Sequence, residues 1–69
     1  MITLKEQLAV LDDNFVELWQ SNKKVAYGYS GYNGTTASPQ FDDYLDKEVI
    51  SLDVCETGEG WYLEIVIKE

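Results

Sequence analysis

The sequence predicts a small α+β domain in which an N-terminal helix packs on a three-stranded antiparallel sheet, in the order α-β-β-β. Three features lead to this prediction: a capping motif followed by apolar residues at helical spacing, a short alternating segment after it, and two alternating segments around a turn near the C-terminus. A chain of 69 residues has room for one compact core. Residues 1–69 are therefore expected to form a single acidic domain.

The helix is expected to begin after Thr3, because Thr3 and Glu6 have the spacing of a capping box. The apolar residues that follow recur at steps of three and four, which places them in one stripe on a helix that runs to about Gln20. The stripe consists of Leu4, Leu8, Leu11, Phe15 and Leu18. Ser21 and Asn22 are expected to end this helix. A core-facing helix is favoured over a coiled coil because the stripe is short.

Large and small side chains alternate between Val25 and Tyr29, which predicts a short strand. The glycines, proline and small polar residues of segment 30–40 predict a long loop. Ser38 and Pro39 can also cap and open a short helix before the C-terminal hairpin. Its apolar face would carry Phe41, Tyr44 and Leu45.

The C-terminal third has the clearest hairpin pattern, since two alternating apolar sets flank residues 57–60. These sets are Ile50, Leu52 and Val54 on one side, and Trp61, Leu63, Ile65 and Ile67 on the other. A two-residue loop places both sets on one face of the sheet and leaves the other face partly polar and open to solvent or a partner. The polar face would carry Ser51, Asp53, Tyr62, Glu64 and Lys68.

Two loops fit this hairpin. A loop at Gly58-Glu59 places Asp53 opposite Glu64, which is an unfavourable pair of like charges. A loop at Thr57-Gly58 places Asp53 opposite Tyr62 instead. The second register is therefore preferred.

Thirteen acidic residues against five lysines and no arginine give a formal net charge of −8. Binding to nucleic acid or anionic lipid by charge neutralisation needs a basic patch, so neither a nucleic acid nor a membrane is expected as a direct partner. An acidic protein attracts basic partners instead. The alternative is that the charge serves only to keep the protein soluble.

A lone Cys55 cannot close a disulfide, and without histidine a zinc site of nitrogen and sulfur ligands is excluded. The first nineteen residues do not have the pattern of a signal peptide, and no apolar run is long enough to span a bilayer. A reducing, cytoplasmic setting is therefore expected. No cofactor or metal is expected.

Catalysis is not expected, since the chain has no histidine base and no arginine to clamp a phosphate. Cys55 is followed by Glu56, whose charge would raise the pKa of the thiol, so Cys55 is interpreted as a packing residue. Segment 42–46 contains three aspartates in a DDxxD pattern, which could ligate Mg²⁺. In so acidic a chain this pattern is better explained as a solvated turn.

The segment from Val25 to Phe41 contains three tyrosines, three glycines and no charged residue. Tyrosine combined with serine, glycine and asparagine is typical of recognition loops, although the tyrosines could also fold back onto the core. Nine of the thirteen acids follow residue 41. The sequence therefore predicts a contact surface in two parts, one aromatic and one acidic.

These features predict a small inhibitor or modulator that binds a basic protein surface, such as that of a nucleic-acid enzyme, as a nucleic-acid mimic. The chain resembles phage anti-restriction and anti-CRISPR proteins in size and charge only, and no motif identifies a family. Tyr29 and Tyr32 are the expected anchors. The expected charged contacts are Asp42, Asp43, Asp46, Glu48, Asp53, Glu56 and Glu59. The alternative is a structural or assembly module that self-associates, for example as a homodimer, with no inhibitory role.

Overall fold

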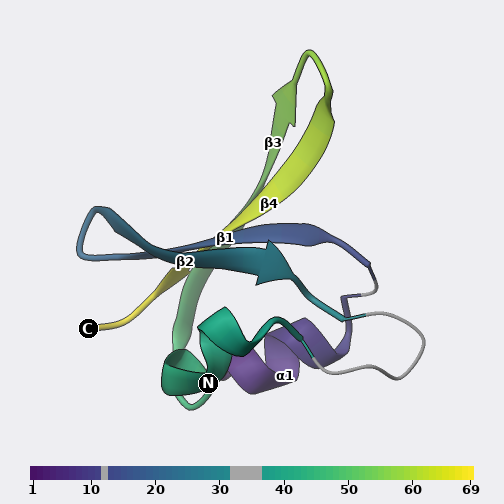
Figure 1. Ribbon diagram of the computed structural model, residues 1–69. Coiled ribbons are helices and arrows are strands. Elements are labelled where there is room, and N and C mark those ends of the chain that lie inside the picture. The colour runs from purple at the N-terminus through teal and green to yellow at the C-terminus, as the bar shows by residue number, and fades with distance from the viewer. Residues whose placement is uncertain (12, 32–36) are drawn as a thin grey trace.

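The computed structural model describes residues 1–11, 13–31 and 37–69 and contains a four-stranded mixed sheet with its helical segments on one side (Figure 1). The elements are α1 (Leu4–Ala9), β1 (Phe15–Gln20), β2 (Lys23–Tyr29), the 3-10 helix η1 (Pro39–Tyr44), β3 (Val49–Thr57) and β4 (Gly60–Ile67). The strand order is β2-β1-β4-β3, with the two central strands parallel and each edge strand antiparallel to its neighbour. The predicted three-stranded antiparallel sheet is therefore wrong, and the domain is largely β.

Helix α1 begins where the sequence predicts but is much shorter. The capping box is confirmed, since Thr3 Oγ1 accepts a hydrogen bond from the Glu6 amide at 3.2 Å and Glu6 Oε1 accepts one from the Thr3 amide at 2.9 Å. The helix ends at Ala9, with Val10 as its C-cap. Asp13 has a φ of 53°, which is incompatible with a right-handed helix. The predicted continuation to Gln20 is therefore wrong.

Residues 15–20 form strand β1 because their buried positions alternate. Val16 and Leu18 are fully buried, whereas Phe15 lies on the opposite face of the sheet from them. Ser21 and Asn22 do not end a helix. Their φ values of 54° and 63° are those of a two-residue type I′ turn, which joins β1 to β2 as a hairpin.

The β3–β4 hairpin has the other of the two possible registers, not the preferred one. Thr57 pairs with Gly60, so the loop is Gly58-Glu59 and Asp53 lies opposite Glu64. Thr57 Oγ1 donates to the Gly60 carbonyl at 3.1 Å and accepts from the Glu59 amide at 3.2 Å. These hydrogen bonds within the turn favour the observed register despite the like-charge pair.

The predicted short helix before the C-terminal hairpin is confirmed as η1. Ser38 is its N-cap, and the Ser38 Oγ accepts a hydrogen bond from the Gln40 amide at 3.4 Å. Phe41 projects from η1 into the core and is fully buried. Thus η1 supplies an aromatic side chain to the face of the sheet that α1 also covers.

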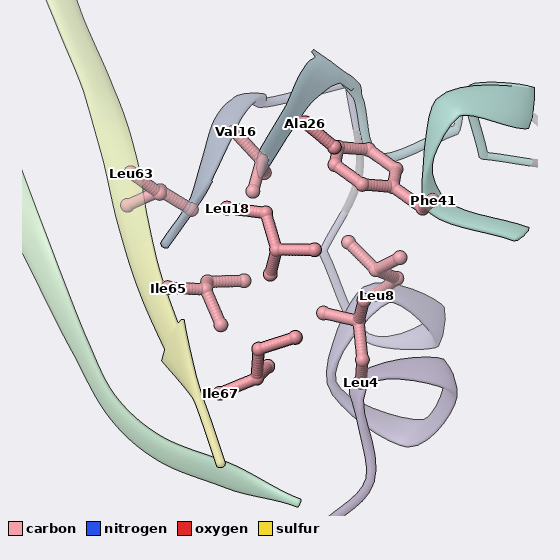
Figure 2. Close-up of a cluster of buried hydrophobic side chains, with 9 residues drawn as sticks. All are labelled: Leu4, Leu8, Val16, Leu18, Ala26, Phe41, Leu63, Ile65 and Ile67. Carbon is pink, nitrogen blue, oxygen red and sulfur yellow. The ribbon is translucent and has the colours of Figure 1, made fainter. Parts of the chain in front are cut away.

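One face of the sheet carries the core, which Figure 2 shows between the strands and the two helical segments. Leu4 and Leu8 of α1 and Phe41 of η1 close over the strands. The strands contribute Val16, Leu18, Ala26, Leu63, Ile65 and Ile67. Leu11, which the sequence placed in the same stripe, packs against this cluster and is only partly buried.

The outer edges of the sheet are protected to different extents. Beside β2, the Tyr27 amide donates to Gln40 Oε1 at 3.2 Å and the Ser38 amide donates to the Tyr29 carbonyl at 3.0 Å. At the start of β3, the Val49 amide donates to the Ile2 carbonyl at 2.8 Å. In the described ranges, no segment pairs with the outer edge of β3 beyond this point.

Gly28 allows η1 to approach β2 closely, and we expect Gly28→Ala to destabilise the fold. A Cβ at this position would lie 2.5 Å from Ser38 Cβ, so the segment that precedes Phe41 must shift. The expected loss is about 1–3 kcal/mol of unfolding free energy, measured by urea denaturation. Gly58→Ala is the matched control, because nothing lies within 4 Å of the Cβ it adds. Equal stability of the two variants would contradict this account.

Candidate functional site

The face of the sheet opposite the core has no helical cover in the part of the chain that the structure describes, and we call it the open face (Figure 1). Its side chains alternate with the core residues along every strand. They are Phe15, Glu17 and Trp19 of β1; Lys24, Tyr27 and Tyr29 of β2; Ser51, Asp53 and Cys55 of β3; and Tyr62, Glu64 and Val66 of β4.

Aromatic rings cluster at the β1–β2 side of the open face. The Phe15 ring lies 5.4 Å from the Tyr29 ring in an edge-on arrangement and 6.1 Å from the Tyr27 ring in a tilted one. Tyr29 nevertheless remains 58% exposed. These contacts orient two tyrosines whose rings can still contact a partner.

Three carboxylates form a row across the middle of the open face. Glu17 of β1 is in register with Glu64 of β4, and Glu64 is in register with Asp53 of β3. Tyr27 of β2 continues the same row, because it pairs with Glu17. Neighbouring strands lie about 4.8 Å apart, so these like charges repel one another.

Only the β2 end of this row is neutralised within the described residues. Lys24 Nζ lies 3.3 Å from Glu17 Oε2 and 5.8 Å from the centre of the Tyr27 ring. Trp19 Nε1 donates to Glu17 Oε1 at 3.3 Å. Glu64 accepts a hydrogen bond from the Tyr62 hydroxyl at 3.4 Å, but no lysine in these ranges forms a salt bridge with Glu64 or Asp53. The negative charge is therefore least compensated toward β3.

Cys55 and Tyr62 form a cross-strand pair beside the carboxylate row. Burial is the main cause that raises the pKa of Tyr62 to about 12, and its hydrogen bond with Cys55 adds to the effect. Burial also raises the pKa of the Cys55 thiol, against the opposing effect of its hydrogen bond with Tyr62, and the charges of Glu64 and Asp53 contribute further. The thiol is therefore poorly activated as a nucleophile, and both groups are uncharged at neutral pH.

The structure places the predicted contact residues on different parts of the molecule. Tyr29 and Asp53 lie on the open face, at opposite ends of the sheet. Asp42 and Asp43 are exposed on η1, and Asp46 follows it, so all three belong to the helical layer on the other side of the sheet. The predicted aromatic and acidic parts are thus not brought together as one continuous surface.

The remaining predicted residues lie away from the open face or outside the described residues. Glu48 is half-buried and forms an isolated bridge with Thr3. Glu56 is exposed on β3 opposite Trp61, on the same side of the sheet as the core, and Glu59 is in the hairpin turn. Tyr32 lies outside the described residues. The binding role of these residues stays a prediction.

Sequence reasoning missed Phe15, Glu17 and Trp19 as members of an exposed face because it placed them in a helix. The signal that could have corrected this is the run from Asp12 to Asn14, three residues that favour turns over helix interiors. If the helix is ended before these residues, the alternation of Val16 and Leu18 that marks β1 becomes visible.

A second exposed feature is the outer part of the β3–β4 hairpin, residues 50–61, which we call the hairpin arm. Its end near the turn projects beyond the helical layer (Figure 1), whereas residues 51–54 pair with the stretch of β4 that also pairs with β1. Val54 and Trp61 are 60% and 66% exposed although they share the side of the sheet that elsewhere forms the core. Ile50 and Leu52 are also exposed. The arm therefore presents apolar side chains that the other described segments do not cover.

Comparison with known proteins found no match to a protein-family model, to a curated protein or to a solved structure. In ranges 1–11, 13–31 and 37–69, no helix has the length and apolar character needed to cross a membrane. The same ranges contain no group of three acidic or cysteine side chains placed to hold a metal ion, and this includes the three aspartates of segment 42–46. The function is therefore argued from the open face and the hairpin arm.

We expect Tyr62 to lose its proton near pH 12 in the folded protein, against an ordinary value of 10. Because the folded state holds this proton more tightly, the stabilisation is fully present below pH 10 and is lost as the pH rises toward 12. An NMR titration of the tyrosine ring carbons would measure this pKa. Tyr62→Phe identifies the late-titrating signal by removing it. A Tyr62 pKa at or below the ordinary value would contradict the described packing against Cys55.

Proposed function

We propose that this protein is a non-enzymatic binding module that inhibits or modulates a basic protein, and that the open face is its main contact surface. The observation that supports this proposal best is the row of Glu17, Glu64 and Asp53 across three strands of an uncovered sheet face. Adjacent like charges lower the stability of a sheet, so this alignment gives no advantage for folding and needs another explanation. A partner that brings lysines or arginines to this row would relieve the repulsion.

Charge and aromatic anchoring have separate roles in this proposal. The net charge of −8 accelerates encounter with a basic surface and makes the association sensitive to salt. Tyr27 and Tyr29 supply broad, amphipathic contact area beside the acids. The electrostatic contribution is greatest toward β3, where Asp53 and Glu64 lack a cation in the described ranges.

The partner that fits this surface best is a protein that itself binds nucleic acid. Its basic groove would accept carboxylates at phosphate positions and aromatic rings where bases stack. In the proposed function, the protein therefore mimics a nucleic acid and does not itself contact nucleic acid or a membrane. A cytoplasmic setting is part of the proposal, because Cys55 is the only cysteine and stays unpaired.

The double variant Asp53→Asn with Glu64→Gln should bind the partner roughly tenfold more weakly or worse, since it removes two uncompensated charges and keeps the side-chain shapes. The partner would first be identified by affinity capture on the immobilised protein, then purified and titrated calorimetrically at about 50 mM and about 200 mM salt. Binding should weaken with salt, and less so for the variant. The variant should also be slightly more stable, because the like-charge pair is lost.

Asp42→Asn with Asp43→Asn is the matched control, because it removes the same charge from the helical layer. It should change the affinity by no more than about threefold, because these two charges act on the partner only through the long-range electrostatic field. Equal losses in both double variants would show that net charge, and not the open face, determines binding. Salt-independent binding to an acidic or neutral partner would contradict the proposed function itself.

A second candidate function is self-association as a structural or assembly module, with the acids serving for solubility. The hairpin arm favours it, because Val54 and Trp61 expose apolar surface next to a strand edge with which no described segment pairs. Repulsion between two chains that each carry −8 opposes it.

Light scattering over a concentration series distinguishes the two functions. Self-association through the arm predicts a mass that rises from 7.9 kDa toward that of a dimer, and a return to the monomer in Val54→Lys. Val10→Lys, the same substitution at an exposed residue beside α1, should leave the dimer intact. A constant monomer mass at all concentrations would eliminate this candidate.

A further inference from the structure

Among the residues that the structure describes, nothing covers the outer edge of β3 beyond its start, whereas the edge of β2 is covered at Tyr27 and Tyr29. Gln40 and Ser38 occupy the edge of β2, and Ile2 occupies the start of β3. From residue 50 to residue 57, no backbone of the described segments pairs with the outer side of β3. Natural sheets usually cover or shorten such an edge, since its free backbone groups can pair with another chain.

The two faces of this edge differ in chemistry. Leu52 and Val54 lie on one face, with Trp61 beside them on β4, and all three are exposed. Ser51, Asp53 and Cys55 lie on the other face, next to Glu64. A strand placed beside β3 would therefore meet Leu52 and Val54 on one side, with Glu56 nearer the turn, and Asp53 on the other.

These observations determine which strand fits. A second copy of this chain would bring another nine-residue acidic strand and a further −8 of charge to the same edge. A strand in which lysine or arginine alternates with apolar residues would place its cations near Asp53 and Glu64 and its apolar side chains against Leu52 and Val54. Charge complementarity thus favours a basic partner strand over self-pairing.

We propose that β3 binds an extended segment of the basic partner as a fifth strand of the sheet, and that this segment alternates basic and apolar residues. The inference rests on the proposed function and specifies how the partner is held. Backbone hydrogen bonds along the edge supply affinity, and the alternating side chains supply specificity. The turn end of the hairpin arm extends beyond the helical layer (Figure 1), and Leu52 and Val54 are exposed beside the free edge.

The test uses a short synthetic peptide of alternating lysine and valine with blocked ends. A matched peptide carries the same side chains but has every backbone amide N-methylated, so it keeps the charge and cannot donate backbone hydrogen bonds. Binding to the full chain would be followed by NMR. The unmodified peptide should shift the amide signals of residues 50–57 and slow their hydrogen exchange, and the methylated one should bind at least tenfold more weakly.

A variant pair checks the same contact from the protein side. Val54→Lys should weaken peptide binding at least tenfold, because it places a cation where the valines of the peptide need an apolar contact and repels the positively charged peptide. Val10→Lys makes the same substitution away from the sheet and should leave binding unchanged. Far-UV circular dichroism of both variants would verify that they keep the native sheet.

The outcomes separate this inference from the proposed function. Equal binding of the methylated peptide, or signal changes confined to the Tyr27–Glu17 side of the open face, would overturn strand addition and leave charge-based binding intact. Failure of both peptides to bind would also overturn strand addition. The proposed function would fail only if, in addition, the captured partner were insensitive to salt and to the Asp53 and Glu64 substitutions.

Discussion

The structure depends on one constraint, which is that the helical segments it describes, α1 and η1, cover only one face of the sheet. Leu4, Leu8 and Phe41 close that face, and each is almost completely removed from solvent. The opposite face consequently keeps Tyr27 and Tyr29 exposed and its other side chains at most half-buried, with Asp53 and Lys24 exposed, and the hairpin arm exposes Val54 and Trp61. The candidate binding surfaces, the open face and the hairpin arm, are thus the parts of the sheet that α1 and η1 do not cover.

The sequence predicted the elements whose signals are local, and it failed where two periodicities overlapped. Thr3 with Glu6, Ser38 with Pro39, and the apolar alternation of the C-terminal hairpin were sufficient to locate α1, η1 and the last two strands. Leu11, Phe15 and Leu18 have helical spacing, whereas Val16 and Leu18 alternate as in a strand. Both patterns run through the same segment, so pattern alone could not separate helix from strand. The parallel pairing of β1 with β4 has no local signature at all.

The candidate site was less predictable than the fold, because it depends on register. Tyr29 and Asp53 were identified from composition, but Glu17 and Phe15 became surface residues only once β1 was recognised as a strand. The Asp53–Glu64 pair is disfavoured on electrostatic grounds and is nevertheless present, stabilised by the turn at Thr57. Local rules are most often broken where a protein has been selected for binding, at some cost in stability.

The parallel contact between β1 and β4 also determines the order in which the sheet can assemble. The β1–β2 and β3–β4 hairpins each join neighbouring segments, whereas Val16 pairs with Leu63 near the other end of the chain. Closing so long a loop is entropically slow compared with forming a hairpin. During synthesis, the centre of the sheet cannot form until Leu63 has left the ribosome. Until then, β1 exposes the edge that later faces β4, and Val16 and Leu18 lack their partners on that strand.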